Sequence, residues 1–206
     1  MTVKDASGCH PRDPRPAAQR VREAAKELFY RQGFHATGVD EVCRVAGTTK
    51  MSLYRAYPSK DALVEAILRE ASEVDSCWSE EALKAVPVRD RPAACLHRAA
   101  EALRQPGFRG CPMGLAIAEF PDPEHPARKV ADAKKQATRE FLRHLCAEAG
   151  AAEPEAVGDG LMLLVEGAFA AVPYLGHAEA ATALERAGRA LLAAALPPAR
   201  PDATGM

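Results

Sequence analysis

Apolar residues recur every three to four positions along most of this chain, which is the period of an α-helix. Over residues 17–32 the apolar stripe consists of Val21, Ala24, Ala25, Leu28 and Phe29. The same spacing predicts further helices over residues 59–78, 92–105, 126–149, 155–175 and 178–196. Alanine is abundant and runs of β-branched residues are few, so the chain is predicted to be all-α, with about nine helices.

A shorter pattern occupies residues 37–60, where two brief helical segments are separated by Gly47. Thr37 is expected to cap the first segment through a capping box that Asp40 completes, and Gly47 ends this segment because glycine readily adopts a left-handed backbone. Thr49 is expected to cap the second segment, which Pro58 terminates. Two short helices joined by a tight turn form a helix-turn-helix, whose second helix lies in the DNA major groove.

The side chains of the second segment suit this role. Leu53 and Tyr57 are four residues apart and are expected to face the core, which leaves the hydrogen-bonding side chains on the outside. Lys50 and Arg55 are the expected donors to bases or phosphates, and Lys60 lies in the first turn of the next helix, where a phosphate would bind. The candidate DNA-binding residues are Thr37, Thr48, Thr49, Lys50, Ser52, Tyr54, Arg55 and Lys60.

Residues 24–63 contain the runs LFYRQGFHATGVDEVCRVAG and TTKMSLYRAYPSKDAL, which resemble the DNA-binding domain of TetR-type transcriptional regulators. The matching positions are Gly33-Phe34, Thr37, Ala46-Gly47, Leu53-Tyr54 and Tyr57-Pro58-Ser59-Lys60. Met51, Ala56 and Tyr57 depart from the residues common in that family, which puts the operator sequence out of reach. The resemblance implies a sequence-specific regulator with a divergent C-terminal domain that dimerises and binds a ligand.

Composition adds a division of charge. The 206 residues are 48% hydrophobic and 27% charged, as in ordinary soluble proteins, with a net charge of −1. Residues 1–70 carry 12 Lys and Arg against 9 Asp and Glu, whereas the remainder carries 15 against 19. A basic head on an acidic body fits DNA binding by the head alone. The expected division is a disordered arm, a helix-turn-helix DNA-binding domain, a ligand-binding and dimerisation domain and a tail, over residues 1–16, 17–60, 61–196 and 197–206.

Other classes of chemistry find no support in the sequence. It has no HExxH, GxSxG or glycine-rich phosphate loop, and its six cysteines form no CxxC pair. No catalytic residue, metal site or cofactor is therefore expected. No secretion signal is recognised, and the apolar stretch 161–176 is interrupted by Glu166 and Pro173 and judged too short to span a bilayer. A cytoplasmic protein with reduced thiols is expected.

The last two predicted helices, residues 155–175 and 178–196, are rich in small residues that allow helices to approach closely. Because more than one face of the first is apolar, a second subunit is the natural cover, which predicts a homodimer on a palindromic operator. The expected interface residues are Gly160, Gly167, Ala171, Leu184 and Leu191.

A ligand pocket is expected where Gly and Pro interrupt residues 106–126. Its expected lining is Trp78, Leu96, Met113, Ile117, Phe120, Met162, Glu166, Phe169 and Tyr174, although ordinary core packing explains each of these residues better when it is taken alone. Glu166 is costly to bury without a partner, so it either bonds across the dimer or faces the pocket. Two functions remain open: a repressor released by a small apolar effector, or a DNA-binding dimer whose body only dimerises or binds proteins. An enclosed apolar cavity would favour the first.

Overall fold

The computed structural model describes residues 14–73 and 80–198, and this part of the chain is helical. Nine of its ten α-helices have seven residues or more, which confirms the predicted all-α class with about nine helices. The helices are α1 Ala17–Gln32, α2 Val39–Val45, α3 Lys50–Ala56, α4 Lys60–Glu73, α5 Glu80–Leu83, α6 Arg91–Arg104, α7 Pro112–Glu119, α8 Pro126–Glu148, α9 Pro154–Leu175 and α10 His177–Ala195, with a short 3₁₀ turn, Val88–Asp90, before α6.

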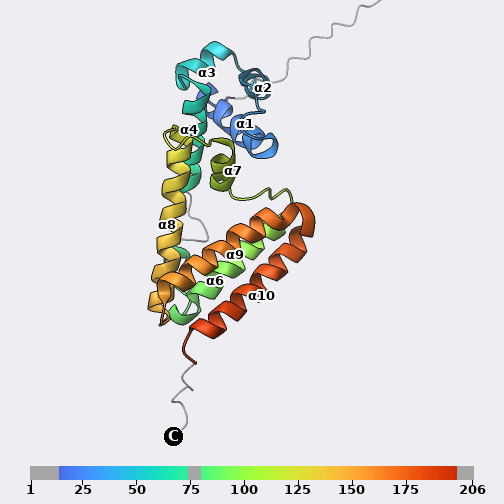
Figure 1. The fold of residues 1–206 in the computed structure, drawn as a ribbon. Helices are drawn as coiled ribbons and strands as arrows, with labels where there is room; N and C mark the ends of the chain where they lie inside the picture. Colours follow the sequence, from blue (N-terminus) through green and yellow to red (C-terminus); the bar gives the residue numbers. More distant parts are fainter. Residues whose placement is uncertain (1–13, 74–79, 199–206) are drawn as a thin grey trace, which may run out of the picture.

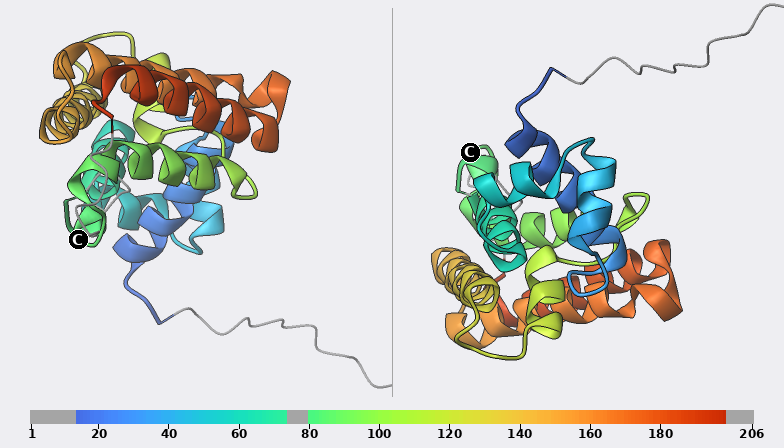
Figure 2. Two further views of the ribbon diagram at one scale, coloured as in Figure 1. Left: turned by 90° about the horizontal axis from the view of Figure 1, so that it is seen from below. Right: turned by 90° about the horizontal axis from the view of Figure 1, so that it is seen from above.

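The helices form a small head on a longer body (Figure 1). α1, α2 and α3 make up the head, and α4 descends from it along the upper part of α8. α6, α9 and α10 form the lower part of the body, where α10 packs against both α6 and α9 (Figure 2). α7 lies between the two parts and packs on α8. The head therefore meets the body through α4, α7 and the start of α8.

Local sequence signals set most helix ends. Gly33 ends α1 with φ +103°, a backbone conformation that other residues rarely adopt. Thr49 caps α3 as predicted, because its side chain accepts a hydrogen bond from the backbone N–H of Ser52 at 3.2 Å. Tyr57 leaves the helical region before Pro58, with φ −135° and ψ 109°. α7, α8 and α9 each begin with proline, whose missing N–H costs nothing at that position.

Two clusters of buried apolar residues form the core. The first cluster contains residues of α1, α2, α3, α4, α7 and the first turns of α8, among them Phe29, Leu53 and Met113. The second joins α6, the lower part of α8, α9 and α10 around Leu103, Leu142 and Leu161. The first cluster crosses the predicted boundary at residue 60, so the apolar core of the head continues into the body. The division of function at that boundary stays a prediction.

Ion pairs fasten α8 to α9. Arg139 and Arg143 of α8 donate through Nε to Asp159 Oδ1 of α9 at 2.7 and 2.8 Å. These hydrogen bonds, first from Arg139 and then from Arg143, hold the pKa of Asp159 well below its usual range. Part of the basic face of α8 is therefore paired with a carboxylate of α9.

One helix of the described residues, α9, is long and apolar enough to cross a membrane by length and composition alone. The apolar stretch over residues 161–176, which was judged too short for a bilayer, belongs almost entirely to this helix, which has 22 residues because it begins at Pro154. In the structure α9 packs against α6, α8 and α10. Only 28% of its most apolar window is buried within the single chain, so an apolar face remains uncovered.

We predict that Gly158→Ala destabilises the junction of α8 and α9. A Cβ atom at Gly158 would lie 2.7 Å from the backbone Cα and N of Arg143, and the backbone cannot yield as a flexible side chain does. The expected loss is about 1–3 kcal/mol in the free energy of unfolding, typical of overpacking. Denaturant unfolding at equal protein concentration measures it. Gly114→Ala is the matched control, because its Cβ would meet neighbours only at 3.7 Å and beyond. Equal stabilities of the two variants would refute the close approach.

Candidate nucleic-acid interface

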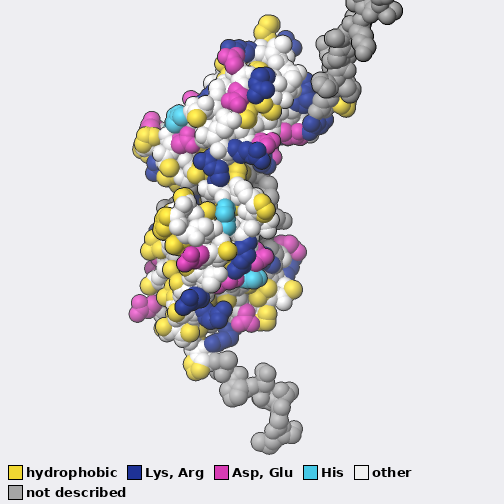
Figure 3. All heavy atoms as spheres, turned by 90° about the vertical axis from the view of Figure 1, so that its right-hand side faces the viewer, with side chains coloured by type: hydrophobic (Ala, Val, Ile, Leu, Met, Phe, Trp, Pro, Cys, Tyr) yellow, Lys and Arg dark blue, Asp and Glu magenta, His cyan; other side chains and the backbone are white. Residues whose placement is uncertain are grey.

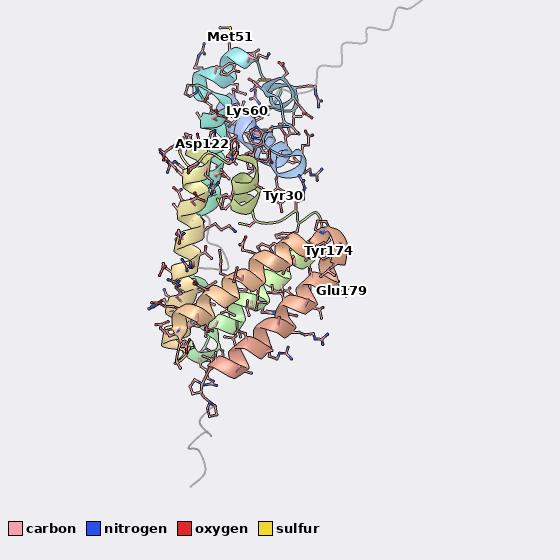
Figure 4. All side chains as sticks on the ribbon, viewed as in Figure 1. Tyr30, Met51, Lys60, Asp122, Tyr174 and Glu179 are labelled. Atoms are coloured by element: carbon pink, nitrogen blue, oxygen red, sulfur yellow. The ribbon has the colours of Figure 1, made fainter. Side chains whose placement is uncertain are left out.

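α3 forms the outer end of the head, with Met51 at its tip (Figure 4). Leu53 holds the helix in place, because its side chain is completely buried in the core of the head. Lys50, Tyr54 and Arg55 are exposed on the remaining surface. A seven-residue helix has little stability of its own, so packing through Leu53 is what presents the polar side chains outward.

Seven of the eight predicted DNA-binding residues lie together at this end of the head. Thr48 and Thr49 precede α3, Ser52 lies in its first turn, and Lys60 begins α4 (Figure 4). The Lys60 amine lies 3.4 Å from the backbone oxygen of His35, so it is held near the turn between α1 and α2. The arrangement offers hydroxyl, amine and guanidinium donors on one surface, which suits contacts to phosphates and base edges.

Thr37 does not belong to this surface, which corrects the prediction. Its side chain is fully buried, and its hydroxyl donates to the backbone oxygen of Gly33 at 2.8 Å. The N-cap of α2 is Gly38, and no side chain caps that helix. Thr37 therefore stabilises the turn before α2, and its hydroxyl is not available to DNA.

Asp40 does not complete a capping box either, because it pairs with Lys50 of α3, with Nζ and Oδ1 2.7 Å apart. The hydrogen bond from Lys50 to Asp40 is the main reason that the pKa of Lys50 is raised. Both side chains are exposed, so water screens the pair. Sequence spacing did not reveal that Asp40 occupies the Lys50 amine in this way.

Two exposed residues of the helix-turn-helix were missed by sequence reasoning. Met51 is 76% exposed, and Arg44 is exposed in the last turn of α2. The helical period places Met51 outside the buried face that contains Leu53. An apolar side chain outside the buried face was the signal that could have identified Met51. A thymine methyl group is the base feature that an exposed apolar side chain contacts in the major groove.

Arg20 of α1 supports the turn between α2 and α3. Its Nε donates to the backbone oxygen of Ala46 at 2.9 Å, and its Nη2 donates to the backbone oxygen of Gly47 at 3.3 Å. These carbonyls end α2 and would otherwise lack partners in the helix. Arg20 therefore sets the position of the turn against α1.

Glu119 fastens the head to the body from the end of α7. Its two carboxylate oxygens accept hydrogen bonds from the backbone N–H groups of Phe34 at 3.0 Å and His35 at 2.7 Å. The ring nitrogen Nε2 of His35 is hydrogen-bonded to the backbone oxygen of Glu119 at 2.7 Å. A Cβ atom at Gly33 would lie 2.9 Å from Glu119 Oε1, so glycine is needed for this approach.

Three rings near Glu119, those of His35, Phe120 and His125, pack one against the next. Phe120 lies against His35 with ring centroids 4.9 Å apart, and stacks on His125 at 4.3 Å. Nε2 of His125 in turn lies 3.6 Å from Oδ2 of Asp61 in α4. The turn that precedes α2 is therefore held by α7, α8 and α4 together.

Comparisons with known proteins agree with this geometry. A family model described as bacterial regulatory proteins of the tetR family matches residues 21–67, which span the helix-turn-helix. A protein from Streptomyces avermitilis assigned as a TetR-type transcriptional regulator is 32% identical, with a TM-score of 0.77, over 88% of this chain and 98% of the other. A TetR-family transcriptional regulator from Streptomyces coelicolor is 28% identical, with a TM-score of 0.82, over 87% and 96%.

The HTH-type transcriptional regulator YjdC of Escherichia coli is 25% identical over 145 residues, 69% of this chain and 76% of its own. Together with the Streptomyces structures, this match extends the similarity well beyond the helix-turn-helix. The chain belongs to the TetR family of transcriptional regulators, whose members bind DNA and form dimers.

The predicted interface residues fall into two groups. Gly160 and Leu191 face each other within the chain, since a Cβ at Gly160 would lie 3.0 Å from Leu191 Cδ2. Gly167 is exposed with open space beside it, and it lines a shallow groove between α9 and α10 together with Ala171 and Leu184. Exposed Leu163, which was not predicted, lines the same groove.

The predicted pocket residues do not form one pocket. Met113, Ile117 and Phe120 pack in the first core cluster, and Met162 and Leu96 pack in the second. Leu96 also lines an open groove between α6 and α10. Tyr174 is 76% exposed near the end of α9 and points away from the body (Figure 4). Trp78 lies outside the described residues, as do the last positions of the helix predicted over 59–78. The pocket failed as a set because its residues come from surfaces that the fold separates.

Glu166 and Phe169 do share a pocket of about 230 Å³ between α7 and α9. The carboxylate of Glu166 is 2.5 Å from the Lys135 amine of α8, so its partner lies within the chain. The two predicted roles of Glu166 were a bond across the dimer and a place in the ligand pocket, and neither includes this ion pair. The second role stays a prediction, because Glu166 lines the pocket described above.

We predict that Glu119→Gln loosens the turn between α1 and α2. An amide has one acceptor oxygen instead of two and carries no charge, so one charge-assisted hydrogen bond is lost, at a cost of about 1.5–3 kcal/mol. Amide hydrogen exchange at Phe34 and His35 should become about tenfold faster or more, since 1.4 kcal/mol corresponds to a factor of ten. Glu124→Gln is the control, because Glu124 pairs with Lys129 on the surface. Unchanged exchange at both amides would show that Glu119 does not hold the turn.

Proposed function

We propose that this chain is a homodimeric, cytoplasmic repressor that binds a palindromic operator through α3 and is released from it by a small apolar effector. The observation that carries the proposal is the polar surface of α3, presented at the outer end of the head by buried Leu53. Lys and Arg side chains lie beside Asp and Glu over the head, so binding depends on local donors more than on net charge (Figure 3).

In this proposal α3 enters the major groove. Lys50 and Arg55 contact bases or phosphates, and Tyr54 and Lys60 anchor phosphates on either side. Thr48, Thr49 and Ser52 contribute hydroxyl groups near the start of the helix, and Met51 adds an apolar contact. Lys50 is released from Asp40 as the phosphates approach, because the exposed ion pair contributes little stability.

The uncovered face of α9 and α10 supports a dimer. Leu163 is 73% exposed there, beside an apolar groove lined by small residues such as Gly167. Two copies that pair their α9 and α10 helices form a four-helix bundle and cover this surface. A two-fold dimer presents two α3 helices to a two-fold symmetric operator.

Release by an effector is supported by the path from body to head. α4 joins the head to the body directly, and α7 holds the α1–α2 turn through Glu119. A ligand that binds one arrangement of these helices better would shift the population away from the DNA-binding arrangement. The dispersal of the predicted pocket residues favours the alternative, in which the body only dimerises or binds proteins.

We predict that Lys60→Ala weakens binding to all DNA sequences alike, because a phosphate contact carries no sequence information. The slope of log K against log salt concentration should fall in magnitude by about 1, since one counterion fewer is released. Fluorescence anisotropy with a duplex that the protein selects from a random library measures both effects. Lys129→Ala removes a lysine from the body and serves as the control. If Lys60→Ala and Tyr54→Ala both bind as tightly as the parent protein, this docking is wrong.

We predict that Leu163→Glu produces monomers that have lost tight DNA binding, because an unpaired carboxylate in an apolar interface is costly. Light scattering at micromolar concentration measures the molecular mass, and circular dichroism checks the fold. Val88→Glu is the matched control, since Val88 is also an exposed apolar residue but belongs to the 3₁₀ turn before α6. A monomeric parent protein would contradict the whole scheme.

A further inference from the structure

A half-open pocket of about 340 Å³ lies between α1, α4 and α7, where the head meets the body. Its walls are apolar: Phe29 and Phe34 belong to the end of α1 and the turn after it, Ile67 and Ala71 to α4, and Leu115 to α7. Among the residues that the structure describes, none of those predicted for the ligand site lines this pocket. The pocket therefore opens at the junction of three elements that join the head to the body.

The polar groups around the pocket already have partners. Lys26 pairs with Glu70 of α4 at 3.4 Å, and Glu27 pairs with Arg31 at 3.6 Å. Glu23 pairs with Arg15 and also accepts a hydrogen bond from Gln19 at 3.0 Å. These rim charges are neutralised within the protein, so they offer no uncompensated charge to a ligand.

Tyr30 closes one side of the pocket and is also satisfied. Its hydroxyl donates to the backbone oxygen of Gly110 at 3.1 Å and accepts from the N–H of Arg109 at 2.8 Å. Figure 4 shows Tyr30 at the lower end of the head, near the segment that precedes α7. The chemistry of the walls and rim therefore selects an uncharged, apolar molecule.

The volume limits the size of that molecule. Pockets for small molecules begin at about 300 Å³, and an engineered cavity of about 150 Å³ holds benzene. A pocket of about 340 Å³ suits a molecule of two fused or linked rings. We propose that this pocket binds an uncharged bicyclic or similarly sized apolar molecule, and that its occupancy lowers the affinity of the head for DNA. The second part rests on the proposed function.

Phe34 connects the pocket to the reading head. Its ring lines the pocket and lies 5.5 Å from the ring of Phe29 and 5.6 Å from that of Phe120. Its backbone N–H donates to Glu119, the contact that holds the turn before α2. A molecule that displaces the Phe34 ring acts on this turn, and one that wedges α4 from α1 changes the angle of the head.

The first experiment measures binding without DNA. Prodan (6-propionyl-2-dimethylaminonaphthalene), an uncharged dye with two fused rings whose fluorescence rises in apolar surroundings, is titrated into the full chain. Ala71→Phe fills the pocket from α4, and Ala133→Phe adds the same ring at an exposed position of α8. The parent and Ala133→Phe should bind one dye per chain, and Ala71→Phe should bind it about tenfold more weakly, a loss of about 1.4 kcal/mol.

A second variant guards against misfolding of Ala71→Phe. Leu115→Ala removes part of the α7 wall and should weaken dye binding by about fivefold, because contacts with the removed carbon atoms are lost. If both pocket variants bind the dye as the parent does, the site is refuted. If the parent binds no dye, the site is refuted as well.

The second experiment repeats the DNA titration with saturating dye. The dye should weaken DNA binding by the parent and by Ala133→Phe, and about tenfold more dye should be needed for the same effect on Ala71→Phe. Dye binding that leaves DNA affinity unchanged in the parent would refute the coupling. A chain that binds the dye in the pocket but selects no duplex would count against the proposed function alone, since the first experiment needs no DNA.

Discussion

The position of the head, which consists of α1, α2 and α3, depends on one carboxylate. Glu119, at the end of α7, accepts both backbone N–H groups that follow Gly33, and these residues begin the turn into α2. A carboxylate that receives two N–H groups is bound more strongly than a neutral acceptor would be. The contact requires a glycine at residue 33, because any Cβ atom there would meet the carboxylate. The residues of α3 are far from Glu119 in sequence, yet their placement relative to the body follows from it.

Sequence reasoning succeeded where the determining contacts are local. The ends of α3 follow from Thr49 and Pro58, and the end of α1 follows from Gly33, so the helix-turn-helix was predictable within the chain segment that contains it. The stripe of buried residues in α1 was predictable for the same reason. A cap or a glycine acts within one turn of helix, and its effect does not depend on the rest of the fold.

The failures share the opposite property. Thr37 and Asp40 were assigned a local capping role, but each bonds to a group that the turn or the neighbouring helix brings near. Glu166 was left between two roles because its partner, Lys135, lies on a different helix. The pocket was the largest failure, since a cavity exists only where several elements leave space between them, and periodicity along one helix carries no information about that space.

The junction pocket and the Glu119 contact meet at Phe34, so the proposed control of the head needs only a modest ligand. The N–H of Phe34 is held by the carboxylate, while its ring forms part of an apolar wall. A ligand that buries about 100 Å² more apolar surface in one arrangement gains about 2.5 kcal/mol there, at roughly 25 cal/mol per Å². Such a difference shifts the equilibrium between the two arrangements by about sixtyfold, as about 1.4 kcal/mol corresponds to a factor of ten. The proposed control of DNA binding therefore needs no large cavity deep in the body, because the junction pocket itself offers apolar surface on α1, α4 and α7.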